Sequence, residues 1–378
     1  MAGSTTRAAE LLRVVHARPG ITRADAARLI GIGTGATTEL VSRLTAAALL
    51  GEQPAPRSGA RGRPTTVLTA HPKGPLVAAV SLTHEAWRVD LVELGGRTVT
   101  ERRGQHDGVD GDAVIAGLAA VVARLRRSRP GRIQGLGIAV PGTVSREARL
   151  DASSLGWHSI DLARIWSGAG VFVAGNDATL AASAESNRGA AVGAGLALHV
   201  RVEAGLGGAL VEAGRVLLGA GGMAGEFGHM PFGDPAVLCP CGARGCWGTA
   251  VDGSALARLL GHRPPPDPVT YGRRIIARAA AGAHPAEAVA VDTVAAALGR
   301  GLAGLVNGLD PDLVTLGGLG VDLLEVAPGP LAGSYRAGLM DFRRSGAPPV
   351  VAAELGPDGP IAGAGEEAWA RPLAGLSA

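Results

Sequence analysis

The chain has 378 residues, a formal net charge of +3, and 47% hydrophobic residues, enough to build a substantial core. No uncharged apolar run is long enough to span a bilayer, and the first residues do not resemble a signal peptide. These features argue against membrane insertion and secretion, and we expect a cytoplasmic protein.

The positive charge is concentrated at one end of the chain. Residues 1–75 carry ten basic and four acidic side chains, an excess of +6, so the rest of the chain carries −3 of the total +3. Such an imbalance suits contact with a phosphate backbone, although a solvated charged face would give the same count.

Three helices are expected in this basic end. Residues 5–20 have apolar side chains at helical spacing and finish with a Pro-Gly stop. Thr22 and Asp25 form a capping-box-like pair that opens a second helix, which ends at Gly31. Residues 34–50 form the third. Helix, helix, short glycine turn and helix is the layout of a helix-turn-helix.

A wing is expected after the third helix, because a turn-rich arm leads into the strand-like residues 65–68. Arg61 and Arg63 in this arm would contact the minor groove or phosphates, and a plain interdomain linker is the alternative.

On the third helix, Glu39 could accept from a cytosine amino group or face away from DNA. The candidate DNA contacts on the third helix are Thr34, Thr37, Thr38, Ser42 and Arg43.

From about residue 75 the pattern changes to alternating strands and helices, which predicts an α/β chain with buried sheets. Strand-rich openings near 76 and near 197 suggest two similar lobes with a cleft between them. The expected strands are 76–82, 87–94, 133–142, 171–177, 196–211 and 313–320, and the expected helices are 111–127 and 293–309.

All three cysteines lie close together, at Cys239, Cys241 and Cys246, and His229 precedes the first by ten residues. Three thiolates and one imidazole make the Cys₃His set of a closed, structural zinc site. The glycines at 242 and 245 would let the loop fold back. Free thiols in a turn are the alternative.

The stretch "GEFGH" followed by "CPCGARGC" resembles the Glu-x-Gly-His and Cys-x-Cys-Gly-x-x-Gly-Cys signature of the ROK family of sugar kinases and sugar-responsive repressors. "GIAVPG", "GNDA" and "LGGLG" support the resemblance. It implies two actin-like (ribonuclease H-like) α/β lobes, preceded by a winged helix-turn-helix only in the repressor branch. The expected domains are 1–72 and 73–378, with a small lobe at about 73–185 plus the C-terminal helix and a large lobe at about 186–364.

The resemblance also implies a sugar pocket. Asn176 and Asp177 match the family's sugar-gripping pair, and Glu226 and His229 match its second sugar-contacting motif. His229 would give one ring nitrogen to zinc and the other to the ligand. The alternative is that Asn176 and Asp177 form only a structural turn.

Two positions depart from the family's sugar motifs. Gly248 stands where a glutamate usually follows the last cysteine, and Ser154 stands in place of a pocket asparagine. Both replacements remove hydrogen bonds from the expected pocket. A different sugar, a phosphorylated sugar or no ligand at all are therefore open alternatives.

The two phosphate turns of ROK kinases are altered. The first would be Asp-x-Gly-Gly-Thr and is Ser81-Leu82-Thr83-His84-Glu85 here, and Glu203-Ala204 replaces the Gly-Thr of the second. A carboxylate aimed at a triphosphate is repulsive, and lost glycines block close approach of the backbone. We therefore expect no catalytic residues and no enzyme activity.

Together these observations predict a sugar- or sugar-phosphate-responsive transcription regulator, a repressor, with structural Zn²⁺. It would bind double-stranded operator DNA as a homodimer or homotetramer. The alternatives are an active ROK sugar kinase with an appended DNA-binding domain, and a regulator with a vestigial pocket that responds to a partner protein.

Overall fold

The computed structural model describes residues 6–55, 66–282 and 284–375. The chain forms two compact units, which are described separately below. The first comprises Met1–Val140, Asp161–Ala174 and Ala364–Ala378, and the second comprises Pro141–Ile160 and Gly175–Gly363.

The first unit begins with a winged helix-turn-helix. Its elements are α1 (Arg7–Ala17), α2 (Arg23–Ile30), α3 (Thr34–Ala46), β1 (Leu50–Pro54) and β2 (Thr66–Ala70), and β1 pairs antiparallel with β2. Thr22 caps α2 by accepting from the Asp25 amide, and Gly31 ends it with a φ of 66°. The three expected helices are confirmed, and β2 matches the expected strand-like segment; its partner β1 was not predicted and begins where the third helix was expected to end.

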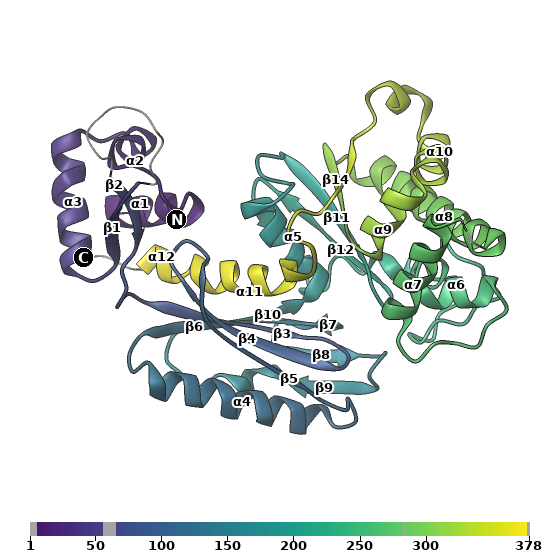
Figure 1. Cartoon of the computed structure of the whole chain (residues 1–378), viewed down its shortest axis with the longest axis horizontal. Helices are drawn as coiled ribbons and strands as arrows, with labels where there is room; N and C mark the ends of the chain where they lie inside the picture. The colour runs from purple at the N-terminus through teal and green to yellow at the C-terminus, as the bar shows by residue number, and fades with distance from the viewer. Residues whose placement is uncertain (1–5, 56–65, 283, 376–378) are drawn as a thin grey trace. The chain divides into compact units, whose positions relative to one another are not determined.

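The first sheet follows the winged domain and has the strand order β10-β6-β3-β4-β5. Its strands are β3 (Leu76–Leu82), β4 (Ala86–Glu93), β5 (Thr98–Gln105), β6 (Ile133–Val140) and β10 (Val171–Asn176). Helices α4 (Gly111–Ser128) and α11 (Gly359–Ala370) lie on opposite faces of this sheet (Figure 1). A Cβ on Gly137 would lie 2.0 Å from the Ala364 carbonyl oxygen, so glycine lets α11 pack directly on β6. A short helix, α12 (Pro372–Gly375), follows.

The second unit contains a sheet with the same plan, in the order β13-β12-β11-β14-β15. In both sheets three antiparallel strands are followed by a strand parallel to the first of them. The strands are β11 (Leu196–Val202), β12 (Leu206–Glu212), β13 (Arg215–Val216), β14 (Leu313–Gly318) and β15 (Val350–Ala352). The expectation of two similar lobes is therefore confirmed at the level of strand order.

A cluster of helices accompanies the second sheet. They are α5 (Asp177–Arg188), α6 (Gly253–Leu259), α7 (Pro268–Ala280), α8 (Pro285–Leu309), α9 (Leu319–Val326) and α10 (Pro328–Gly338). A separate three-stranded sheet contains β7 (Thr143–Val144), β8 (Arg149–Ala152) and β9 (Trp157–Asp161). The sequence interpretation placed 175–185 in the small lobe, but α5 packs on the second sheet through Ala182, Ala209 and Val211.

Helix α8 is long and apolar enough to cross a membrane by length and composition, yet 67% of its most apolar window is buried inside the protein. Its buried residues belong to the core of the second unit. It is therefore a core helix in this structure.

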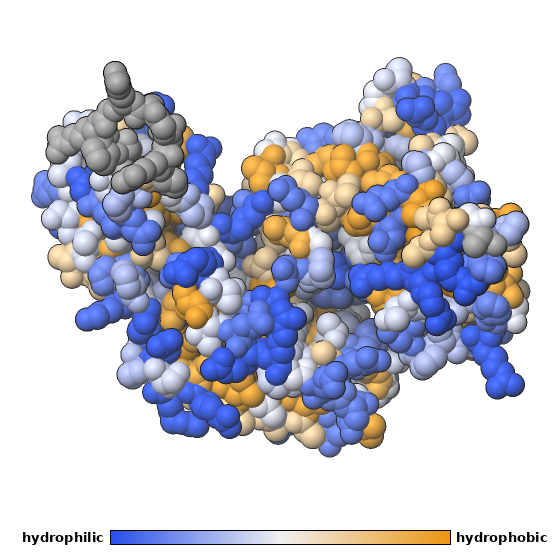
Figure 2. Space-filling model, viewed as in Figure 1, coloured by the Kyte–Doolittle hydropathy of each residue, from blue (hydrophilic) through white to orange (hydrophobic). Residues whose placement is uncertain are grey.

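On the face shown in Figure 2, polar and apolar residues are interspersed.

Candidate functional site

Four side chains of types that can ligate a metal ion converge in the second unit, as the sequence predicted. The ligand atoms of His229, Cys239, Cys241 and Cys246 all lie within 4.8 Å of one another. The Sγ atoms of Cys241 and Cys246 are 3.7 Å apart, and Cys239 Sγ lies 3.8 Å from His229 Nδ1. Two sulfurs bound tetrahedrally at about 2.3 Å from zinc would be about 3.8 Å apart. The group therefore fits a closed tetrahedral site for a metal ion.

The loop that carries the cysteines is closed by its own backbone. The Cys239 amide donates to the Ala243 carbonyl at 2.8 Å, and the Gly242 amide donates back to Cys239 at 2.9 Å. Gly242 and Gly245 have φ values of 91° and 72°, a region that L side chains rarely adopt. Both glycines thus have the turn-forming role expected from the sequence.

Trp247 fixes this loop to the core, a contact that the sequence analysis missed. Its side chain is fully buried, and its Nε1–H donates to the Ala297 carbonyl of α8 at 3.1 Å. A Cβ on Gly301 of α8 would lie 2.1 Å from the indole ring, so only glycine leaves room for it. The one sequence signal was a glycine inside an apolar helix, which does not reveal its partner.

The His229 ring faces two groups at once. Its Nδ1 lies toward Cys239, while its Nε2 is 3.6 Å from a carboxylate oxygen of Glu226. The other oxygen of Glu226 accepts from the Thr143 hydroxyl at 3.0 Å. Nδ1 thus faces the cysteine cluster and Nε2 faces Glu226, and the division of the ring between a metal and a ligand remains a prediction. No sequence motif pointed to Thr143.

Asn176 is the N-cap of α5, and its side chain is engaged with backbone. Its Oδ1 accepts from the amides of Ala178 and Thr179 at 2.9 and 3.3 Å, and its Nδ2 donates to the Gly142 carbonyl at 3.0 Å. One amide hydrogen is left for a ligand. These bonds are those of the structural-turn alternative, so a sugar-binding role for Asn176 remains a prediction.

The remaining pocket residues have different degrees of exposure. Asp177, the first residue of α5, is half-buried. Ser154 is exposed after β8, and Gly248 is buried without a side chain to offer. Ligand binding by Asp177 and Glu226 also remains a prediction.

The altered second phosphate turn joins β11 to β12 and holds an ion pair. An Arg201 guanidinium nitrogen lies 2.6 Å from Glu203 Oε1, and burial raises the pKa of Glu203. A Cβ on Gly318, in the "LGGLG" motif, would lie 2.9 Å from the same oxygen. Glu203 therefore lies against the glycine turn at the end of β14, and Arg201 neutralises it.

The altered first phosphate turn, in the first unit, joins β3 to β4. The Thr83 amide and hydroxyl both donate to the Ala86 carbonyl, at 2.8 and 3.1 Å. The hydroxyl also accepts from the Ala86 amide at 3.1 Å. These bonds close the turn on itself and occupy the backbone groups that a glycine-rich turn would offer to a phosphate.

The candidate DNA contacts on α3 divide by exposure. Thr37 is 1% exposed and its hydroxyl donates to the Gly33 carbonyl at 3.0 Å, so its expected surface position is wrong. It falls on the apolar face of α3 with Leu40, Val41 and Leu44. Arg61 and Arg63 lie outside the described residues. The candidates that are exposed are Thr34, Thr38, Ser42 and Arg43.

The N-terminal elements and the repeated sheet plan define the class: a winged helix-turn-helix followed by an actin-like, sugar-kinase-like domain. The same fold occurs in a solved ROK family transcriptional regulator, a homolog of the E. coli MLC protein. The TM-score is 0.74 at 22% identity, over 97% of this chain and 96% of that one. The sequence pattern of the ROK family matches residues 87–370, and the chain belongs to this family.

Curated relatives include both kinases and a regulator. The chain is 34% identical to a kanosamine kinase of Amycolatopsis mediterranei (strain S699), over 64% of this chain and 79% of the kinase. It is 25% identical to a putative xylose repressor of Caldicellulosiruptor sp. (strain Rt8B.4), over 81% of both proteins. Family membership is thus compatible with either activity.

Proposed function

We propose that this protein is a transcription regulator, a repressor, that binds operator DNA and responds to a sugar or sugar phosphate without phosphorylating it. The Arg201–Glu203 ion pair is the observation that carries the proposal. It holds the Glu203 side chain against Gly318, in the turn where a kinase would approach the phosphates of ATP, and the side chain takes up the space that a phosphate group would need there.

The winged domain supplies the DNA-binding half of the proposal. The exposed face of α3 presents hydroxyl and guanidinium groups that can contact bases and phosphates. A recognition helix reads one half-site, so we propose a homodimer or homotetramer on a two-fold symmetric operator. The similarity to a putative xylose repressor, which extends over 81% of this chain, supports the regulatory assignment.

The sugar half of the proposal rests on Asp177, Glu226 and His229. Glu226 and His229 are in contact, and His229 also faces the cysteine cluster. We propose that structural zinc holds the His229 ring through Nδ1, so that Nε2 and the Glu226 carboxylate can bind sugar hydroxyls. Asp177 would accept from a further hydroxyl, as a binding residue without catalytic work.

The test is enrichment of genomic DNA fragments by the purified full chain, with and without a panel of free and phosphorylated sugars. We expect one palindromic site, lost or strengthened with one sugar. Arg43→Gln should weaken binding and reduce the slope of log affinity against log salt by about 1, whereas the exposed Arg127→Gln on α4 should not. Absence of any enriched site would refute the regulator.

The second candidate is a sugar kinase with an appended DNA-binding domain. It is favoured by the relatives named as kinases, including the kanosamine kinase at 34% identity. ATP turnover with the same sugar panel separates the two. Turnover that disappears in Asp177→Asn would establish the kinase and overturn our interpretation of Glu203. DNA binding without any response to sugars would instead favour control by a partner protein.

A further inference from the structure

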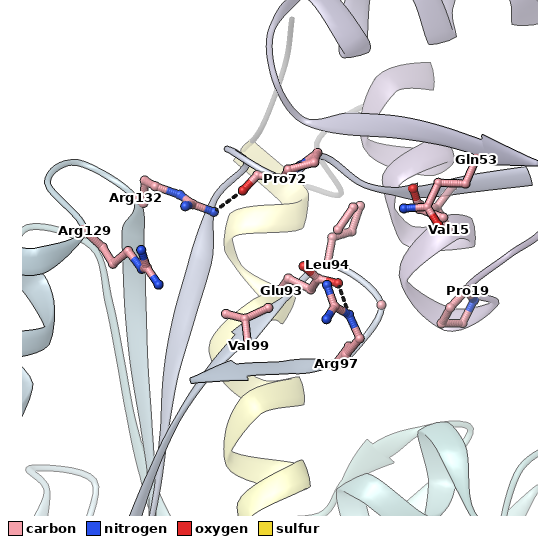
Figure 3. Close-up of a pocket in the computed structure, with 13 residues that line it drawn as sticks. Val15, Pro19, Gln53, Pro72, Glu93, Leu94, Arg97, Val99, Arg129 and Arg132 are labelled. Atoms are coloured by element: carbon pink, nitrogen blue, oxygen red, sulfur yellow. Dashed lines mark hydrogen bonds and ion pairs between the residues drawn. The ribbon is translucent and has the colours of Figure 1, made fainter. Parts of the chain in front are cut away.

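A cavity of about 670 Å³ lies within the first unit, between the winged domain and the first sheet (Figure 3). Val15 and Gln53 are on its winged-domain side. The turn between β4 and β5 and the segment after α4 form the opposite side. Small-ligand pockets typically have volumes of about 300 to 1,000 Å³, so the cavity can hold a molecule of sugar-phosphate size.

The lining of this cavity is positively charged. It contains Arg97, Arg129 and Arg132 but a single acidic residue, Glu93. Arg97 Nε donates to Glu93 Oε1 at 2.7 Å, so this carboxylate is already paired. The charges of Arg129 and Arg132 remain without a counter-charge among the lining residues.

The two remaining arginines differ in how they are held. Arg132 donates from Nε to the Gly74 carbonyl at 2.8 Å and from Nη2 to the Pro72 carbonyl at 3.0 Å, which fixes its guanidinium. Arg129 makes no side-chain hydrogen bond or ion pair with the part of the chain that the structure describes. In Figure 3 both side chains project from the same side of the cavity.

We propose that this cavity binds a small organic anion, with its phosphate or carboxylate on Arg129 and Arg132. Guanidinium groups form strong, charge-assisted hydrogen bonds with both kinds of anion, and a fixed guanidinium loses less freedom on binding. Leu94 and Val99 offer apolar contact to the carbon skeleton of the ligand. The site is independent of the proposed sugar pocket, whose residues belong to the second unit.

An anion bound in this cavity would affect the position of the winged domain. The amide of Gly95, a lining residue, donates to His16 Nδ1 on α1 at 3.0 Å. A ligand that contacts both walls binds best when the winged domain keeps this position and therefore stabilises it. Occupation of the cavity thus favours the present position of the winged domain against the first sheet.

The test is calorimetric titration of the full chain, at fixed ionic strength and without DNA, with glucose 6-phosphate, gluconate, inorganic phosphate and glucose as probes. We expect a charged sugar derivative to bind and glucose not to bind at this site. Arg129→Gln should weaken that binding on the order of ten-fold, because one charge-assisted contact is lost. Arg127→Gln, an exposed position on α4 outside the cavity, is the matched control and should bind normally.

Asp177→Asn separates this site from the proposed sugar pocket. Binding that survives Asp177→Asn and weakens in Arg129→Gln supports the proposal, whether or not the protein proves to be a sugar-responsive regulator. Binding that is lost only in Asp177→Asn, binding that is equal in both arginine variants, or no heat from any charged probe would overturn it. Hydrogen exchange should also show ligand-dependent protection of the Gly95 amide.

Discussion

The contact between α1 and α11 gives a quantitative prediction about how the winged domain is held. His16 Nε2 lies 3.1 Å from Glu366 Oε2, and the two side chains are only 7% and 10% exposed. His16 Nδ1 accepts from the Gly95 amide, so in the neutral ring the proton is on Nε2 and is donated to the carboxylate. The Trp369 ring packs at 5.6 Å from the imidazole.

Two substitutions test this contact at different strengths. Glu366→Gln keeps the shape of the side chain and an acceptor oxygen but loses the charge. It should lower the free energy of the local opening that exposes the Gly95 amide by about 1 kcal/mol. His16→Ala removes one hydrogen-bond donor from a buried carboxylate and should lower it by about 2 kcal/mol. Because the residues interact directly, the effects in the double variant should fall short of additivity by about 1 kcal/mol.

The assay is native-state hydrogen exchange of the Gly95 amide, because unfolding of a chain with two units need not be two-state. Glu325→Gln, on the exposed side of α9, is the control and should leave Gly95 unchanged. Additive effects, or a change below about 0.5 kcal/mol in His16→Ala, would refute the reasoning that this pair holds α1 against α11.

Three further predictions concern the second unit. Gly301→Ala forces a methyl group into the Trp247 ring and should lower the free energy of unfolding by about 1–3 kcal/mol. In the control, Gly308→Ala on the same helix, the methyl group meets nothing within 4 Å and should not destabilise the protein. Equal melting temperatures of the two variants would contradict this prediction. Cys241→Ser should lose bound zinc and melt at a lower temperature, and full zinc content by elemental analysis would exclude the metal site. Burial raises the pKa of Asp252 to about 6, above its pKa of about 4 in the unfolded chain. The preference of the folded state for protonated Asp252 therefore contributes fully to stability below about pH 4, and this contribution is lost as the pH rises through 6. Asp252→Asn, which keeps a side-chain cap for α6, should therefore raise the unfolding free energy by about 2 kcal/mol at pH 7.5 and by little at pH 3.5; an equal gain at both pH values would show that ionisation is not the cause.

Local signals in the sequence predicted much of the fold. The helices of the winged domain, the capping pair at Thr22 and Asp25, and strands β3, β4, β6, β10 and β14 depend on periodicity and on turn residues within a few positions. The expected single strand 196–211 is instead the hairpin of β11 and β12, and the edge strands β5 and β15 were not predicted. The cysteine loop was equally predictable, since its ligands and its turn glycines lie close together in the chain. Spacing alone therefore indicated the loop geometry and a group of side chains that can hold a metal ion.

Other features were decided by contacts between distant segments. Thr37 has the polarity of a surface residue, yet the packing of α3 buries it. Asn176 matches a ligand-binding motif, but its side-chain amide caps the start of α5 and donates to the carbonyl of Gly142, 34 residues earlier. The sequence interpretation named Glu203 but not its partner Arg201. The alternation of residues along a strand predicts which face of the sheet a side chain is on, but not which group it contacts there.

What the sequence indicated by itself was the three N-terminal helices, several central strands of the repeated α/β plan, the resemblance to the family, and the group of three cysteines and one histidine that can hold a metal ion. The tertiary structure decided which side of His229 faces the cysteines, how Trp247 meets Gly301, and how His16 meets Glu366 across 350 residues of chain. The physical reason is that backbone preferences act over a few residues, whereas burial and hydrogen bonding depend on neighbours that only the folded chain brings together.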